Sequence, residues 1–104
     1  MNEQNKHVED AVIDVEEFAK AGKPIPDAKY YNIKVDKEKY MVDHAVVTGH
    51  EVLTLAGFSP ADQYRLDLKF KGGKAVKVEL DERVDLRETG VERFFTMKLD
   101  QTEG

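Results

Sequence analysis

Residues 64–70 alternate between apolar and polar side chains, and this pattern constrains the fold more than any other in the chain. Successive side chains of a β-strand point to opposite faces, so the segment predicts a strand with one buried face and one face in water. Gly72 and Gly73 follow, and glycine pairs suit the positive φ angles of a tight hairpin into 75–78. The apolar positions are Tyr64, Leu66, Leu68 and Phe70, and the polar ones are Arg65, Asp67 and Lys69.

The segments on either side of this hairpin predict three more strands and one helix. Residues 29–35 and 39–43 both suit strands, and Asp36-Lys37-Glu38 between them predicts a turn, which gives a hairpin. Thr48 and Glu51 have the spacing of a capping box at a helix start, and Gly57 suits its end. Residues 91–97 predict the last strand, after a polar connection over 81–90. The order is strand, strand, helix, strand, short strand, strand.

The first 28 residues predict a separate element. Apolar residues recur at spacings of three and four, which favours an amphipathic helix over residues 7–20. Gly22 and Pro24 suit its end, and the segment 23–27 predicts a stiff linker. We therefore divide the chain into residues 1–28 (helix and linker), 29–97 (folded domain) and 98–104 (C-terminal tail). Because the linker separates the helix from the sheet, we expect the helix to dock on a partner or a second copy rather than on its own domain.

Composition narrows the classes of function. The 104 residues carry a net charge of −5, which argues against nucleic acid as the partner. No apolar run approaches a membrane span and the start lacks a signal-peptide core, so we expect a cytoplasmic protein without a membrane partner. Cysteine is absent, and His7, His44 and His50 lack metal-ligand spacing. We expect no metal, no cofactor, no catalytic residues and no enzymatic activity.

The chain closes on glycine after a short polar tail. Gly104 has no Cβ, so a partner can enclose its backbone closely and reach its carboxylate. A strand followed by a polar tether and a glycine carboxylate indicates a chain whose C-terminus is the reactive group. We expect Gly104 to be the conjugation site and the tail before it to be held by an activating enzyme; these tail residues are Leu99, Asp100, Gln101, Thr102 and Glu103.

The strand order, with one helix across a mixed sheet, is similar to the α+β ubiquitin-like β-grasp (ββαββ). The motifs resemble those of the bacterial multiubiquitin-domain family over about residues 29–97. Residues 1–28 lie outside the resemblance, and Glu103 stands where ubiquitin-like modifiers often have a second glycine. The motifs that carry the resemblance are Tyr30-Tyr31-Asn32-Ile33-Lys34-Val35-Asp36, Val46-Val47-Thr48-Gly49-His50-Glu51-Val52-Leu53, Leu55-Ala56-Gly57, Tyr64-Arg65-Leu66, Val84-Asp85-Leu86-Arg87 and Gly90-Val91-Glu92-Arg93-Phe94-Phe95.

The resemblance implies a protein modifier. Its carboxylate would be adenylated by an ATP-dependent activating enzyme, transferred to a conjugating enzyme and then to target proteins, with a JAB-type peptidase as a further partner. Two alternatives stay open: a non-covalent β-grasp interaction module, and a sulfur carrier that uses a C-terminal thiocarboxylate. The Glu-Gly ending and the long N-terminal segment count against the sulfur carrier.

The solvent face of the sheet is the candidate partner surface. We expect Ile33, Leu66, Leu68 and Phe95 to face the helix, which leaves the opposite parity exposed. An exposed aromatic cluster beside a reactive tail suits docking; the alternative is that Phe94 packs beneath the N-terminal helix or linker. The candidate docking residues are Tyr30, Arg65, Lys69 and Phe94.

Overall fold

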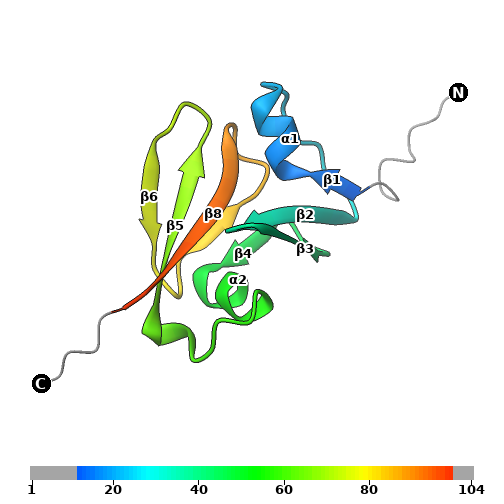
Figure 1. Cartoon of the computed structure of the whole chain (residues 1–104). Helices are drawn as coiled ribbons and strands as arrows, with labels where there is room; N and C mark the ends of the chain where they lie inside the picture. Colours follow the sequence, from blue (N-terminus) through cyan, green and yellow to red (C-terminus); the bar gives the residue numbers. More distant parts are fainter. Residues whose placement is uncertain (1–11, 100–104) are drawn as a thin grey trace, which may run out of the picture.

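The main sheet of the protein holds six strands in a mixed arrangement, and the computed structural model describes residues 12–99 (Figure 1). Its strands run in the order β1-β2-β8-β5-β6, and β3 also pairs with β2. Strands β4 and β7 form a second, two-stranded sheet. The elements are β1 (Val12–Asp14), α1 (Val15–Lys20), β2 (Tyr30–Val35), β3 (Glu38–Val42), β4 (Val46–Thr48), α2 (Gly49–Leu55), the 3₁₀ helix η2 (Ala61–Gln63), β5 (Tyr64–Phe70), β6 (Ala75–Val78), β7 (Arg83–Asp85) and β8 (Val91–Lys98).

Two antiparallel hairpins form where the alternation predicts them. The β2–β3 hairpin closes at the pair Val35–Glu38, and Asp36 in its turn has a φ of 56°. The β5–β6 hairpin turns through Gly72 and Gly73, both of which have positive φ. Strand β8 joins the hairpins, because it runs antiparallel to β5 and parallel to β2. This arrangement fits a β-grasp-like α+β fold.

Helix α2 begins as the capping pattern predicts. The Thr48 hydroxyl accepts a hydrogen bond from the Glu51 N–H at 3.1 Å. The next residue, Gly49, lies so close to the loop after β6 that a Cβ there would collide with the carbonyl oxygen of Glu79. The His50 N–H also donates to the Leu80 carbonyl at 2.9 Å. Glycine at this position therefore lets the first turn of α2 dock on the loop over residues 79–82.

The apolar core lies between α2 and one face of the main sheet, which we call the inner face. Direct cross-strand partners share a face, so the pairs Val35–Phe94 and Leu68–Phe94 place three of its residues. Helix α2 adds Val52 and Leu53, which are at most 1% exposed. The opposite side is the outer face, which carries Lys34, Lys39, Lys69 and Arg93.

The N-terminal segment differs from the predicted one. Helix α1 begins only at Val15, and Val12–Asp14 forms a strand parallel to β2. The predicted helical residues 7–11 lie outside the described range. Val15 and Ala19 are 1% and 2% exposed, so α1 packs on its own domain against β2 and β8. The expectation that this helix docks on a partner is wrong for the described part, because its apolar stripe is already buried.

The linker between α1 and β2 is tied to the domain as well. The hydroxyl of buried Tyr31 accepts a hydrogen bond from the Ala28 N–H at 2.8 Å. Arg87 binds Asp27 of the linker at 2.7 Å and also bonds to Asp85 at 2.9 Å. The guanidinium of Arg87 lowers the pKa of the Asp85 carboxyl by donating hydrogen bonds to it. These contacts hold the linker beside the loop that follows β7.

The polar connection over residues 81–90 contains structure that its composition does not predict. Strand β7 pairs antiparallel with β4, through Val47–Val84 among others. Val84 and Leu86 are 6% and 0% exposed. Val84 and Leu86, the two buried apolar residues of this connection, therefore close one end of the core. Within residues 12–99, no helix is long and apolar enough to cross a membrane.

Candidate functional site

The base of the C-terminal tail is anchored at the edge of the β5–β8 ladder. Lys98 pairs with Tyr64, and the Leu99 N–H donates to the Gln63 carbonyl at 2.9 Å. The side chains of Met97 and Leu99 are 63% and 40% exposed. In Figure 1 the end of β8 extends beside the start of β5, away from α1. The backbone is thus fixed up to Leu99 while the side chains at its end remain open to a partner.

A small groove lies beside this anchor point. Its volume is about 160 Å³, and η2, β5, β6, the loop after β6 and Leu99 contribute to it. Apolar Leu99 and Tyr64 share it with charged groups of both signs, so it suits a short mixed polar and apolar contact. Its lining residues are Asp62, Tyr64, Arg65, Lys77, Val78, Glu79, Leu80 and Leu99.

The predicted conjugation residue lies beyond the described range. Asp100, Gln101, Thr102, Glu103 and Gly104 follow Leu99 and are outside residues 12–99. Five extended residues span at most about 18 Å, which sets how far Gly104 reaches from Leu99. The assignment of Gly104 as the reactive end stays a prediction.

Two of the four predicted docking residues share the outer face of β5. Arg65 is exposed and its Nε donates to Asp67 Oδ1 at 2.9 Å. Lys69 is half-buried and its Nζ lies 3.3 Å from Glu92. Tyr30 lies instead at the start of β2, where Lys29 Nζ sits 5.8 Å from its ring centroid. Tyr30 has the parity of Lys34, so it lies on the same outer face as Arg65 and Lys69 but on β2 instead of β5.

The prediction that Phe94 belongs to the docking surface is wrong. Its side chain is 1% exposed and belongs to the inner-face core. Phe95, which we expected to face the helix, is half-buried instead. The centroid of its ring lies 4.8 Å from the guanidinium carbon of Arg93. Because Phe94 and Phe95 are adjacent and both apolar, the alternation pattern does not show which of them faces the core. Met97 is also apolar and shares the face of Phe95, so it favoured the incorrect assignment. Phe94 is removed from the docking surface.

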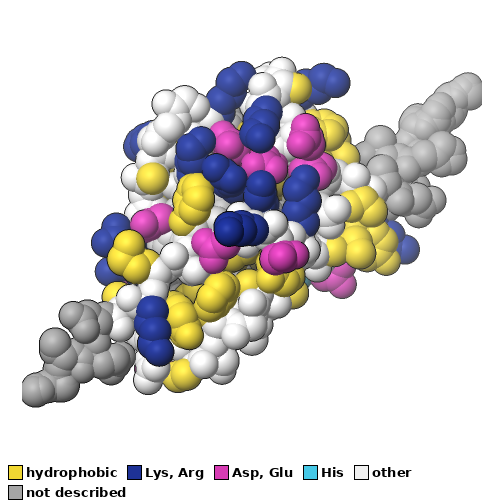
Figure 2. Space-filling model, in the orientation of Figure 1, with side chains coloured by type: hydrophobic (Ala, Val, Ile, Leu, Met, Phe, Trp, Pro, Cys, Tyr) yellow, Lys and Arg dark blue, Asp and Glu magenta, His cyan; other side chains and the backbone are white. Residues whose placement is uncertain are grey.

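A charged network covers the outer face where α1 meets β2 and β8. Glu16 is at its centre, with a side chain only 3% exposed and four basic groups within 3.8 Å. Figure 2 shows basic and acidic side chains intermixed over this part of the surface. The basic groups are Lys20 at 3.5 Å and Lys34, Lys39 and Arg93 at 3.8 Å.

The same corner of α1 gathers three carboxylates, from Asp14, Glu16 and Glu17. Asp14 caps the helix by accepting from the Glu17 N–H at 3.2 Å, and it also binds Lys39 Nζ at 2.6 Å. Its hydrogen bond raises the pKa of Lys39. Because basic side chains already surround these acids, the cluster serves as an ionic contact between α1 and the sheet. Periodicity treated Glu16 as the polar face of a helix, and no local signal in the sequence marks it as buried.

These features define a ubiquitin-like β-grasp protein: a mixed sheet crossed by one helix, with its last strand leading into a polar tail. The family model for multiubiquitin matches residues 31–98, which is well over half of the chain. The chain therefore belongs to the multiubiquitin family. No curated protein and no solved structure matches it significantly.

Proposed function

We propose that this chain is a bacterial ubiquitin-like protein modifier that acts through the carboxylate of Gly104. The observation that carries the proposal is the multiubiquitin match, which ends at residue 98 and so leads directly into the tail. The exposed end of β8 supports it, because Met97 and Leu99 offer apolar contacts at the base of that tail.

The chemistry belongs to partner enzymes. A carboxylate does not react with an amine until it is activated, and adenylation by ATP supplies that activation with release of pyrophosphate. An enzyme thiol then displaces AMP, and a target amine displaces the thiol to leave an amide bond. Splitting one difficult step into easier covalent ones lowers each barrier. This chain supplies the acyl group, the tether and a surface for recognition.

The recognition surface we propose lies at the base of the tail. Arg65 pairs directly with Met97 on the outer face, and Leu99 lines the adjacent groove. These three residues present a cationic group beside two exposed apolar side chains. An activating enzyme that binds them would hold the tail at a fixed starting point, about 18 Å or less from Gly104.

Deletion of Gly104 tests the proposal. The chain is incubated with ATP and the proposed activating and conjugating enzymes, and covalent adducts are detected by mass spectrometry. We expect the full chain and Thr102→Ala to form adducts and the deletion variant to form none. Circular dichroism confirms that all three are folded. Adducts from the deletion variant would require another acyl donor and refute the proposal.

A further inference from the structure

Strand β3 lies at an edge of the main sheet. Within the described part of the chain, β3 pairs only with β2. The hairpin closes at Val35–Glu38 with a two-residue turn, and hydrogen-bonded and non-hydrogen-bonded pairs alternate away from it. The pair Asn32–Met41 is therefore non-hydrogen-bonded, so the N–H and C=O groups of Met41 point to the unpaired edge. An unpaired edge is a template for another strand.

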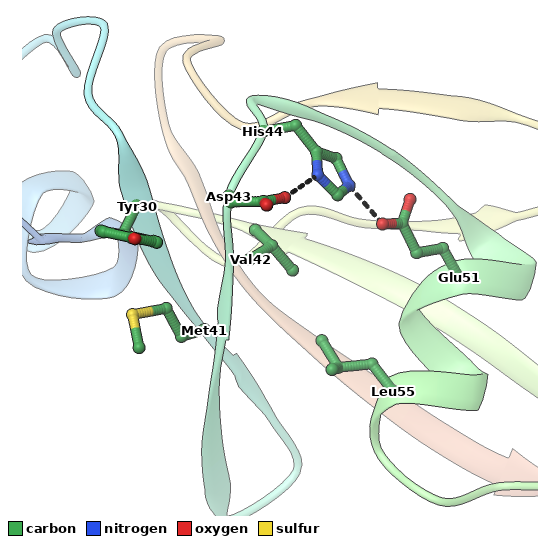
Figure 3. Close-up of a pocket in the computed structure, with 7 residues that line it drawn as sticks. All are labelled: Tyr30, Met41, Val42, Asp43, His44, Glu51 and Leu55. Atoms are coloured by element: carbon green, nitrogen blue, oxygen red, sulfur yellow. Dashed lines mark hydrogen bonds and ion pairs between the residues drawn. The ribbon is translucent and has the colours of Figure 1, made fainter. Parts of the chain in front are cut away.

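Apolar side chains flank that edge on both sides. Figure 3 shows Tyr30 and Met41 on one side of the β3 backbone and Val42 and Leu55 on the other. Met41 is 52% exposed and Leu55 of α2 is 37% exposed, although both are large and hydrophobic. A hollow of about 350 Å³ runs along these residues. An added strand points alternate side chains to opposite faces, so it would contact both apolar pairs at once.

The end of the groove is acidic. His44 lies between Asp43 and Glu51, with its Nδ1 2.7 Å from Asp43 Oδ1 and its Nε2 bonded to Glu51 (Figure 3). The Asp43 side chain is 73% exposed and that of Glu51 is 36% exposed, so both carboxylates face solvent. Two carboxylates against one histidine leave this end with net negative charge. It therefore favours a lysine or arginine on whatever binds.

The negative charge at the end of the groove also discriminates between the segments that could bind there. Residues 1–11 carry Glu3, Glu9 and Asp10 against Lys6, and residues 100–104 carry Asp100 and Glu103 with no basic residue. Both ends of the chain are thus acidic, and like charges beside Asp43 and Glu51 would oppose their binding. A basic segment of another protein meets no such repulsion.

We propose that the groove between β3 and α2 binds an extended segment of a partner protein by adding a strand to β3. The segment carries apolar residues at successive positions, which contact Met41 on one face and Leu55 on the other. A lysine or arginine at one end lies beside Asp43 and Glu51. Main-chain hydrogen bonds supply affinity and the side-chain contacts supply selectivity. The proposal goes beyond the modifier function and does not depend on Gly104.

An NMR titration tests this binding mode. The probe is a blocked synthetic peptide with two lysines followed by alternating valine and isoleucine, and a second peptide has two glutamates in place of the lysines. We expect the lysine peptide to shift the amide signals of Lys39 and Met41 and the methyl signals of Leu55. We expect the glutamate peptide to bind at least tenfold more weakly.

Two methionines provide a matched pair of variants. Met41→Lys places a charge at the unpaired edge of β3, and Met97→Lys makes the same change at a site on β8 that is also exposed, since the two side chains are 52% and 63% exposed. We expect Met41→Lys to raise the Kd for the lysine peptide at least tenfold and Met97→Lys to leave it within twofold. The amide spectra of both variants confirm that they are folded.

Three results would overturn the proposal. Equal weakening by the two lysine variants would show that binding does not use β3. Equal binding of the glutamate peptide would remove the role of Asp43 and Glu51. Concentration-dependent shifts of Met41 and Leu55 without peptide would assign the groove to a second copy of this chain.

Discussion

The inner face of the main sheet is closed by apolar side chains, whereas the outer face is crossed by a charged network centred on Glu16. Phe94, Leu66 and Leu68 of the inner face are each at most 3% exposed. On the outer face, Lys34, Lys39 and Arg93 surround one buried carboxylate. The free energy gained by burying apolar side chains does not depend on the direction of their contacts, whereas that of an ionic contact depends on which charged groups meet. The alternation of apolar and polar residues therefore predicts which side chains form the inner face, but it does not predict the ionic contacts of the outer face.

The largest expected effect on stability is a difference between substitutions of two adjacent phenylalanines. Phe94→Ala should lower the free energy of unfolding by about 3–5 kcal/mol, as removal of a fully buried aromatic side chain does. Phe95→Ala should lower it by less than about 1.5 kcal/mol, because it removes mainly a half-buried ring and its cation–π contact. Urea denaturation of both variants measures the difference. Equal losses would show that the two faces are not distinct in stability.

Deletion of residues 1–20 tests whether α1 is part of the domain. Burial of Ile13 and Val15 contributes roughly 1.5–3 kcal/mol each, and the cost of ordering the segment offsets part of it. We expect a net loss of about 2–4 kcal/mol in the free energy of unfolding by that reasoning. Deletion of residues 1–11 is the control, since it removes neither side chain. An unchanged melting temperature after the longer deletion would restore the predicted boundary between residues 1–28 and the folded domain.

A smaller effect is expected from the charged network alone. Glu16→Gln keeps the shape of the side chain but removes the charge shared by the surrounding basic groups. We expect a loss of about 1–2 kcal/mol, below the 3–5 kcal/mol typical of fully buried pairs because these cations are partly exposed. The control is Glu17→Gln in the same helix turn, where Glu17 is exposed, and it should stay within about 0.5 kcal/mol. Equal effects of both variants would contradict a central role for Glu16.

The smallest effect concerns His44, at the edge between the two faces. Hydrogen bonds from its ring to Asp43 and Glu51 raise the pKa of His44 above its ordinary 6.5. The stability it contributes is fully present below pH 6.5 and is lost as pH rises through the folded-state pKa. An NMR titration of the ring should give a pKa above 6.5, and Asp43→Asn should lower it. A folded-state pKa at or below that value would contradict the contact.

Much of the fold can be predicted from local pattern, because its elements are set by near neighbours in the sequence. Thr48 and Glu51 mark the start of α2, and the alternation over residues 64–70 marks β5. The turn at Gly72 likewise depends on backbone freedom at that position. Each of these signals lies within a few residues of the element it predicts.

The parts that could not be predicted depend on distant partners. Strand β7 forms because Val84 pairs with Val47 in a segment that is otherwise polar. Val12–Asp14 becomes a strand because the edge of β2 offers it hydrogen bonds, which overrides its helical periodicity. Of the docking residues, Arg65 and Lys69 are on the outer face as predicted, while Phe94 follows the register of β8 into the core.

The central claim, that Gly104 is the acyl donor, is tested most directly by trapping the activated tail. The chain is incubated with the proposed activating enzyme, ATP and hydroxylamine, and the C-terminal peptide is sequenced by mass spectrometry. We predict a hydroxamate on the carboxyl group of Gly104, formed only when ATP is present. A C-terminal peptide that remains an unmodified acid, while the same enzyme activates another substrate, would contradict the claim.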